Sequence, residues 1–204
     1  MPTVVGIDLA SAPEYGAKRY NRVGLAALDE SLNLVGSAAA RFTDGEILDF
    51  VARYRPDVVA IDAPLSFPVA GTLREVDRVL LRQGFRPYPP LIPSMAALTK
   101  RGVALRATLE STGTRVIETY PGAAQDVLGL PRKQVSREQL AAGLRRLGVR
   151  RLETLDGDTL DAVTACYVAH CHLRGNYEAL GPPTDVQVIN PRPAFGPLRG
   201  YGLA

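Results

Sequence analysis

The sequence has few of the side chains on which several common catalytic sites depend. It holds two cysteines and two histidines in 204 residues. The cysteines lack the paired spacing of a zinc site, and neither Ser66 nor Ser94 has an assignable histidine partner for a hydrolase triad. A glycine-rich Walker loop for nucleotide phosphates is also missing. These absences argue against cysteine-zinc, serine-hydrolase and Walker-type classes.

Long apolar segments are missing as well. No run approaches the roughly 18 apolar residues of a membrane-spanning helix, and the N-terminus enters a strand pattern without the basic and apolar regions of a signal peptide. Cys166 and Cys171 lie five residues apart in one predicted helix, where they point in different directions. We therefore expect two small buried thiols without a mutual disulfide. Together these features predict a cytoplasmic protein with no membrane segment.

What is present is the composition of a folded protein. Hydrophobic residues make up 46% of the chain and charged residues 22%, and 204 residues suit one compact domain. The net charge of +3, from 24 basic and 21 acidic residues, permits nucleic acid as a partner without establishing it. We expect a single domain over residues 1–204, and the sequence leaves open whether copies form a homo-oligomer.

Hydrophobic patterns predict an alternation of strands and helices. Strand patterns occupy residues 3–9, 21–29, 33–41, 57–62 and 114–118. Helical patterns occupy residues 44–54, 73–83, 94–110, 121–129, 136–147 and 158–173. This order predicts an α/β fold with a mixed five-stranded sheet flanked by helices. The first three strands are expected to be antiparallel and the later ones parallel.

Two segments interrupt this alternation. A proline-rich, partly helical insertion of about residues 63–111 follows the fourth strand, and a tail rich in proline and glycine spans about residues 181–204. The tail contains one strand-like stretch, at residues 186–189. Because the insertion starts where the fourth strand ends, we expect it to rise beside the carboxyl end of that strand.

Three of the buried strands end in a carboxylate. Asp8, Asp62 and Glu118 each follow an apolar residue at the end of such a strand. If the strands are parallel neighbours in similar register, the three acids meet at the edge of the sheet where ligands generally bind. Clustered carboxylates raise one another's pKa, and Mg²⁺ or Mn²⁺ would relieve that cost. The alternative is that these acids only begin loops; the shared phase of the three favours a metal site.

A further acid pair opens the last predicted helix. Asp158 and Asp161 are three residues apart, so they share a face in the first turn. They could complete a metal site. Equally, Asp158 could be the N-cap and Asp161 the third helical residue of an acidic capping box. The helix pattern leaves both interpretations open.

Several motifs together resemble a known family. They are GIDLA at 6–10, IDAPLSFP at 61–68, the helix with Arg74, Asp77 and Arg78 followed by PYPP, ETYPGAA at 118–124, and DTLDA at 158–162. In this order, over roughly residues 4–170, they resemble domain-of-unknown-function family 429, which is described as predicted nucleases of the ribonuclease-H-like fold. The resemblance implies that fold for this chain.

A more distant similarity concerns the last helix, where D-x-x-D-A at 158–162 runs into residues 168–172. This helix is similar to the last helix of bacterial Holliday-junction resolvases, in which acids on the first strand, the fourth strand and this helix bind metal ions. The metal ligands and catalytic residues that the similarity implies here are Asp8, Asp62, Asp158 and Asp161. The fourth-strand acid of that family is a glutamate, in place of the shorter Asp62. Glu118 has no counterpart there, so it could be a catalytic ligand, a base, or a group that binds something else.

Arginines recur every four residues in the insertion, at Arg74, Arg78, Arg82 and Arg86. Since guanidinium forks suit phosphate oxygens, we expect Arg74, Arg78 and Arg82 to bind substrate. The alternative is an ordinary solvated helix face. Tyr88 and Tyr120 could add stacking surfaces, or could simply pack against the core.

The leading hypothesis is a nuclease or phosphodiesterase that hydrolyses nucleic-acid phosphodiester bonds with carboxylate-held Mg²⁺ or Mn²⁺ and water as the nucleophile. The second is a non-catalytic nucleic-acid or nucleotide-binding module of the same fold. A third, an actin-like or sugar-kinase-type ATP-binding protein, also opens with a G-I-D-L strand. It needs two such domains, which 204 residues do not readily supply. The sequence does not distinguish DNA, RNA and nucleotide as the substrate.

Overall fold

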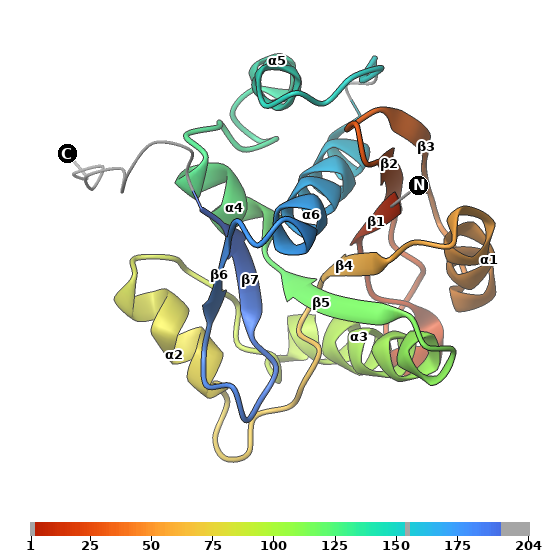
Figure 1. Cartoon of the computed structure of the whole chain (residues 1–204). Coiled ribbons are helices and arrows are strands. Elements are labelled where there is room, and N and C mark those ends of the chain that lie inside the picture. The colour runs from red at the N-terminus through yellow and green to blue at the C-terminus, as the bar shows by residue number, and fades with distance from the viewer. Residues whose placement is uncertain (1–2, 154–155, 193–204) are drawn as a thin grey trace.

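One seven-stranded sheet forms the centre of the protein. The computed structural model describes residues 3–153 and 156–192 (Figure 1). The strands are β1 (Thr3–Asp8), β2 (Val23–Asp29), β3 (Leu34–Ala40), β4 (Val58–Asp62), β5 (Arg115–Thr119), β6 (Tyr177–Leu180) and β7 (Val188–Pro191). Their order across the sheet is β3-β2-β1-β4-β5-β7-β6. The strands β1, β4 and β5 therefore lie side by side.

The strand directions agree with the predicted mixed sheet. β1, β2 and β3 pair antiparallel, while β1 pairs with β4, and β4 with β5, in parallel. The predicted number of five strands is wrong, because the hairpin β6–β7 adds two more beyond β5. Each of these strands has four residues, too few to show a clear alternation of apolar and polar side chains. The strand-like stretch at 186–189 overlaps β7, whereas β6 gave no usable signal. Residues 193–204 of the predicted tail lie outside the described residues.

Six α-helices and one short 3₁₀ helix connect the strands within the described residues. They are η1 (Pro13–Tyr15), α1 (Asp44–Tyr54), α2 (Glu75–Arg82), α3 (Pro93–Ser111), α4 (Pro121–Val127), α5 (Arg137–Arg146) and α6 (Gly157–Leu173). Local chemistry sets several of the starts. Thr43 and Glu46 form a capping box at α1, the Ser136 side chain accepts from the backbone of Gln139 at α5, and prolines open α3 and α4. The helix boundaries match the sequence prediction to within about two residues.

Helices cover both faces of the sheet. Figure 1 shows α4, α5 and α6 on one face and α1 and α3 on the other, and each face has its own hydrophobic core. Helix α6 crosses closely over β1. A methyl group at Gly6 would lie 2.1 Å from the carbonyl oxygen of Ala162, so only glycine permits this approach. This contact brings the start of α6 next to the carboxyl end of β1.

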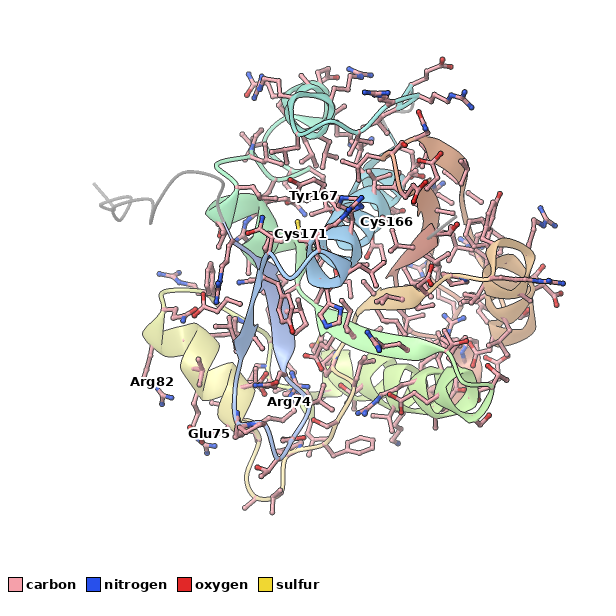
Figure 2. All side chains as sticks on the ribbon, in the orientation of Figure 1. Arg74, Glu75, Arg82, Cys166, Tyr167 and Cys171 are labelled. Atoms are coloured by element: carbon pink, nitrogen blue, oxygen red, sulfur yellow. The ribbon has the colours of Figure 1, made fainter. Side chains whose placement is uncertain are left out.

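Both cysteines lie in the buried part of α6, and neither forms a disulfide (Figure 2). The Sγ of Cys166 donates to the carbonyl oxygen of Ala26 at 3.1 Å. Burial raises the pKa of the Cys166 thiol and raises that of Cys171 to about 11. The prediction of two buried thiols is confirmed. No helix among the described residues is both long enough and apolar enough to cross a bilayer.

A buried arginine on α3 holds the loop after β1 in place. The Arg101 guanidinium donates to the carboxylate of Asp44 at 2.7 Å and to the carbonyl oxygens of Ala10 at 2.6 Å and Phe42 at 2.7 Å. Its side chain is fully buried. These bonds link the insertion, the start of α1 and the segment that follows Asp8. These bonds therefore fix the position of the segment that leaves the carboxyl end of β1.

Candidate functional site

Two aspartates stand side by side at the carboxyl edge of the sheet. Asp8 ends β1, Asp62 ends β4, and the parallel register pairs them directly. Residues paired in register project to the same face, here the face covered by α6, and neighbouring strands lie about 4.8 Å apart. The predicted juxtaposition of Asp8 and Asp62 is therefore what the register produces.

The first turn of α6 adds two more aspartates on this face. The N-cap is Asp156, whose Oδ1 accepts a hydrogen bond from the backbone nitrogen of Thr159 at 3.0 Å. Asp158 is therefore free of the capping role that the sequence had left open for it. Asp161 accepts a hydrogen bond from the Gln125 side chain at 2.8 Å, which orients its carboxylate. Both helix acids lie at the edge where β1 ends, because they contact the same lysine side chain as Asp8 does.

A lysine that sequence reasoning missed lies among these acids. The Lys133 Nζ is 3.1 Å from Asp8 Oδ2, 3.0 Å from Asp158 Oδ1 and 2.9 Å from Asp161 Oδ2. It comes from the segment between α4 and α5, and its stem passes Gly157, where a Cβ atom would meet the lysine Cδ at 3.1 Å. The one available signal was scarcity, since this arginine-rich chain contains three lysines. We call Asp8, Asp62, Asp158, Asp161 and Lys133 the aspartate cluster.

The electrostatics of the aspartate cluster are unfavourable for its acids. Burial, followed by repulsion from Asp161 and Asp158, raises the pKa of Asp8 to about 7 despite the attraction of Lys133. Burial and the neighbouring Asp8 raise the pKa of Asp62 well above its ordinary value. Burial alone would lower the pKa of Lys133, but Asp8 and Asp161 raise it instead, so the ammonium stays charged. Within the described part of the chain, the Asp62 carboxylate has no hydrogen-bond or ion-pair partner.

Glu118 does not join this cluster. The register pairs Glu118 with Ile61 and pairs Asp62 with Thr119, so Glu118 projects to the opposite face of the sheet. The expectation that it shares the phase of the aspartates is wrong by one residue. Burial raises the pKa of Glu118, although two bonds from the Arg74 guanidinium, each 2.7 Å, favour its charged form. The backbone nitrogen of Leu65 donates to the same carboxylate at 2.8 Å.

The arginines predicted to bind substrate take different positions. Arg74 is 2% exposed and is held by Glu118 and by Asp77, which it contacts at 2.8 Å. We call Arg74, Asp77 and Glu118 the arginine cluster. Arg78 and Arg82 are exposed and lie near Glu75; Figure 2 shows Arg82 and Glu75 on the outer side of α2 and Arg74 on its inner side. The four-residue spacing therefore does not produce one ligand-facing stripe.

A cavity of about 590 Å³ joins the sheet edge to the insertion. Asp8, Asp62 and Lys133 line it, as do residues of the arginine cluster. Its other walls carry both apolar and polar groups, which include Leu80, Arg86, Tyr88, Met95, Leu98, Tyr120 and Arg132. The cavity thus contains the carboxylates together with aromatic, apolar and cationic side chains.

The donor set of the aspartate cluster suits a hard divalent cation. Carboxylate oxygens are the preferred ligands of Mg²⁺, and Asp62 beside Asp8 offers a carboxyl group that has no partner among the described residues. In the conformation of residues 3–153 and 156–192, however, no three Asp, Glu, His or Cys side chains are arranged to hold an ion. The Lys133 ammonium lies within 3.1 Å of three of the four aspartates, where it would compete with an ion. The residues fit such an ion if Lys133 withdraws from at least part of this contact.

Solved structures resemble this arrangement of strands and helices. RuvC from Thermus thermophilus in complex with a Holliday-junction substrate superimposes with a TM-score of 0.54 and 14% sequence identity, covering 86% of this chain and 97% of that one. A second structure of Thermus thermophilus RuvC gives a TM-score of 0.50 and 14% identity, covering 85% and 96%. At this identity the likeness concerns the fold.

Sequence comparison identifies one family. The profile of the family described as "Protein of unknown function (DUF429)" matches residues 6–186. Among curated proteins, none matches this sequence. The matched range includes the second half of β1, the strands β2 to β6, all six α-helices and every residue of the aspartate and arginine clusters.

Proposed function

The chain belongs to the DUF429 family of proteins of unknown function, and we propose that it is a divalent-metal-dependent nuclease or phosphodiesterase acting on nucleic-acid phosphodiester bonds. The observation that carries this proposal is the register pair Asp8–Asp62 at the carboxyl edge of a RuvC-like sheet. Asp62 is half-buried beside another acid, and its carboxylate has no hydrogen-bond or ion-pair partner among the described residues. Such an arrangement costs stability, and protein sites that accept this cost are commonly functional.

Each member of the aspartate cluster has a proposed role. Asp8 and Asp62 hold Mg²⁺ or Mn²⁺ from the sheet, and Asp158 and Asp161 complete the site from α6. When bound, such ions activate a water nucleophile and neutralise charge on the leaving oxygen. Because the pKa of Asp8 is raised to about 7, its proton has to leave before it can act as a ligand.

Lys133 keeps the cluster compact in the absence of an ion. Its ammonium contacts three carboxylates within 3.1 Å and so reduces their mutual repulsion. With a bound ion compensating those carboxylates, the Lys133 side chain would be free to contact a phosphate oxygen in the cavity that it lines. Lys133 is therefore a proposed phosphate-binding residue, in place of the buried Arg74.

The likeness to RuvC supports nucleic acid as the substrate class. RuvC is bound to a Holliday junction in one of the two structures, and its fold covers 86% of this chain. The cationic side chains Arg86 and Lys133 line the cavity beside the aspartates, where a phosphate would enter, and so does Arg132, which is also paired with Asp126. A non-catalytic binding module would need these cations, but it would have no use for an unpartnered Asp62.

The test is a calorimetric titration of Mn²⁺ and Mg²⁺ into the wild type, Asp62→Asn and Asp49→Asn. Asp49 is an exposed acid on α1 and serves as the matched control. We expect the wild type and the control to bind Mn²⁺ and Asp62→Asn to bind at least tenfold more weakly. Cleavage of single-stranded and duplex DNA and RNA is then measured with Mn²⁺ present.

Two outcomes would overturn the proposal. If the wild type binds neither ion with nucleic acid present, the acids are loop starts and the binding module becomes the better interpretation. If Asp62→Asn binds Mn²⁺ as tightly as the wild type, the site lies elsewhere.

A further inference from the structure

The aspartate cluster opens into the cavity of about 590 Å³, and residues of the insertion form part of the lining of that cavity. Leu80 on α2, Arg86 and Tyr88 in the segment after α2, and Met95 and Leu98 on α3 all line the same cavity as Asp8 and Asp62. Tyr120 and Arg132, which lie outside the insertion, line the cavity as well. A phosphate that reaches Asp8 and Asp62 through this cavity therefore meets side chains from both segments.

The insertion is tied down on both sides of this part of the lining. Arg74, just before α2, is bonded to Glu118 of β5 at 2.7 Å and to Asp77 at 2.8 Å, and all three side chains are at most 4% exposed. On α3, the Arg101 guanidinium donates to the carbonyl oxygens of Ala10 at 2.6 Å and Phe42 at 2.7 Å, both of which lie outside the insertion. Buried ion pairs of this kind are costly to break once one partner is displaced. The part of the cavity lining that the insertion supplies is therefore held in place by buried contacts.

The size of the cavity limits what can reach the aspartates. Its volume of about 590 Å³ falls within the range of roughly 300–1,000 Å³ that is usual for small-molecule sites. A nucleotide unit fits such a space. A whole duplex, which is wider than its own major groove of about 12 Å, does not fit inside this space. Enzymes that act on one nucleotide in a pocket take it out of the duplex or use single strands.

The walls have the chemistry that recognises a nucleotide. Tyr88 is 69% exposed, and the Arg132 guanidinium lies over the Tyr120 ring at 5.9 Å from its centroid. Bases stack on such aromatic and guanidinium surfaces irrespective of sequence. Arg86 is exposed and has no ion-pair partner among the described residues, so its guanidinium is available to a phosphate.

We propose that this cavity binds a single nucleotide unit and presents its phosphodiester to Asp8 and Asp62, so that the substrate is a dinucleotide or the free end of a single strand. This inference rests on the proposed function, which names the bond that is hydrolysed. It adds that an unbroken duplex or a four-way junction is excluded. Hydrolysis uses one water for each ester bond, leaving a phosphate monoester on one product and a hydroxyl on the other.

The first experiment measures binding without cleavage. Thymidine 5′-monophosphate is titrated by calorimetry into the wild type, Arg86→Ala and Tyr88→Ala. The matched controls are Arg53→Ala, an exposed arginine on α1, and Phe67→Ala, an exposed aromatic in the insertion outside the cavity lining. We expect about tenfold weaker binding for each cavity variant and unchanged binding for both controls. Equal binding by Tyr88→Ala, Arg86→Ala and the wild type would overturn the inference.

The second experiment compares substrates with Mn²⁺ present: a dinucleotide, a linear single strand, a circular single strand and a four-way junction. Release of mononucleotides from the dinucleotide and from the linear strand, with the circle and junction intact, supports the inference, and the first two arms separate a free dinucleotide from a strand end. Cutting of the circle or the junction would overturn it while leaving the proposed nuclease function standing. Nucleotide binding without cleavage of any substrate would instead count against the nuclease function alone.

Discussion

Two groups of charged side chains meet at the same edge of the sheet, and they differ in how completely they are paired. In the arginine cluster the guanidinium of Arg74 bonds both carboxylates, and every side chain is at most 4% exposed. In the aspartate cluster Lys133 contacts three carboxylates, one of which, Asp158, also pairs with Arg22 at 3.0 Å. The fourth, Asp62, has no partner among the described residues, and the exposed fraction reaches 29% at Asp158. The first arrangement is a closed structural contact, whereas the second retains a carboxyl group that a ligand can satisfy.

The sharpest test of this difference is the loss of activity on neutralising Asp62. We expect Asp62→Asn to reduce phosphodiester hydrolysis on the order of 10³-fold, because an ion ligand supplies several kcal/mol of transition-state stabilisation. The melting temperature should not fall, since the carboxylate has no partner to lose. Steady-state cleavage rates and thermal melts of the same preparation check both statements, with Asp49→Asn as the control. A fully active Asp62→Asn protein would remove the functional distinction between the clusters.

The arginine cluster should respond in the opposite way, through stability. Arg74→Met leaves two buried carboxylates without a cation and is expected to cost about 3–5 kcal/mol in the free energy of unfolding. Urea denaturation measures this. The exposed Arg78→Met is the control and should change stability by less than about 0.5 kcal/mol. A loss below about 1 kcal/mol for Arg74→Met would show that the insertion is not held as described.

Substitution of Lys133 should affect stability in a way that depends on metal, because the lysine is expected to compensate the carboxylates only when no ion is bound. Without metal, Lys133→Met should lower stability by about 1–3 kcal/mol, since three carboxylates lose a charged donor. Saturating Mn²⁺ should restore most of that loss by binding only the folded state. Thermal melts with and without Mn²⁺ test this, with the exposed Lys100→Met as the control. If Mn²⁺ raises the melting temperature of Lys133→Met less than that of the wild type, Lys133 does not occupy the position in which an ion would compensate the carboxylates.

The smallest expected effect is on the pH dependence of metal-free stability. Burial and neighbouring acids raise the pKa of Asp8 from 3.8 to about 7 and raise that of Asp62 well above its ordinary value, so the folded state keeps protons that the unfolded state releases. The free energy of unfolding should therefore fall as pH rises from about 4 through 7. At pH 8, Asp62→Asn should melt about 2–4 °C above the wild type, equivalent to ~1 kcal/mol, and at pH 4 the two should coincide. If the difference in melting temperature between Asp62→Asn and the wild type is the same from pH 4 to pH 8, the raised pKa of Asp62 is contradicted.

Local sequence patterns were sufficient to predict much of the frame. Caps, prolines and hydrophobic periodicity set the six α-helices and five of the strands, because these signals act within a few residues of one another. The pairing of Asp8 with Asp62 was also predictable, since both acids follow matched buried strands that become parallel neighbours. The sequence alone therefore placed the proposed metal ligands at two strand ends, Asp8 and Asp62, and at the start of one helix.

Only the tertiary structure decided which charges meet. A shift of one residue in register turned Glu118 to the other face of the sheet, because side chains alternate along a strand. Arg74 is buried because it bonds two acids, one of which is 44 residues away in the sequence. Lys133 contacts Asp8, from which it is separated by 125 residues. Periodicity within one segment carries no information about such contacts, which depend on how distant segments pack. The cavity beside the aspartates arises in the same way, from an insertion whose walls come together only in the folded chain.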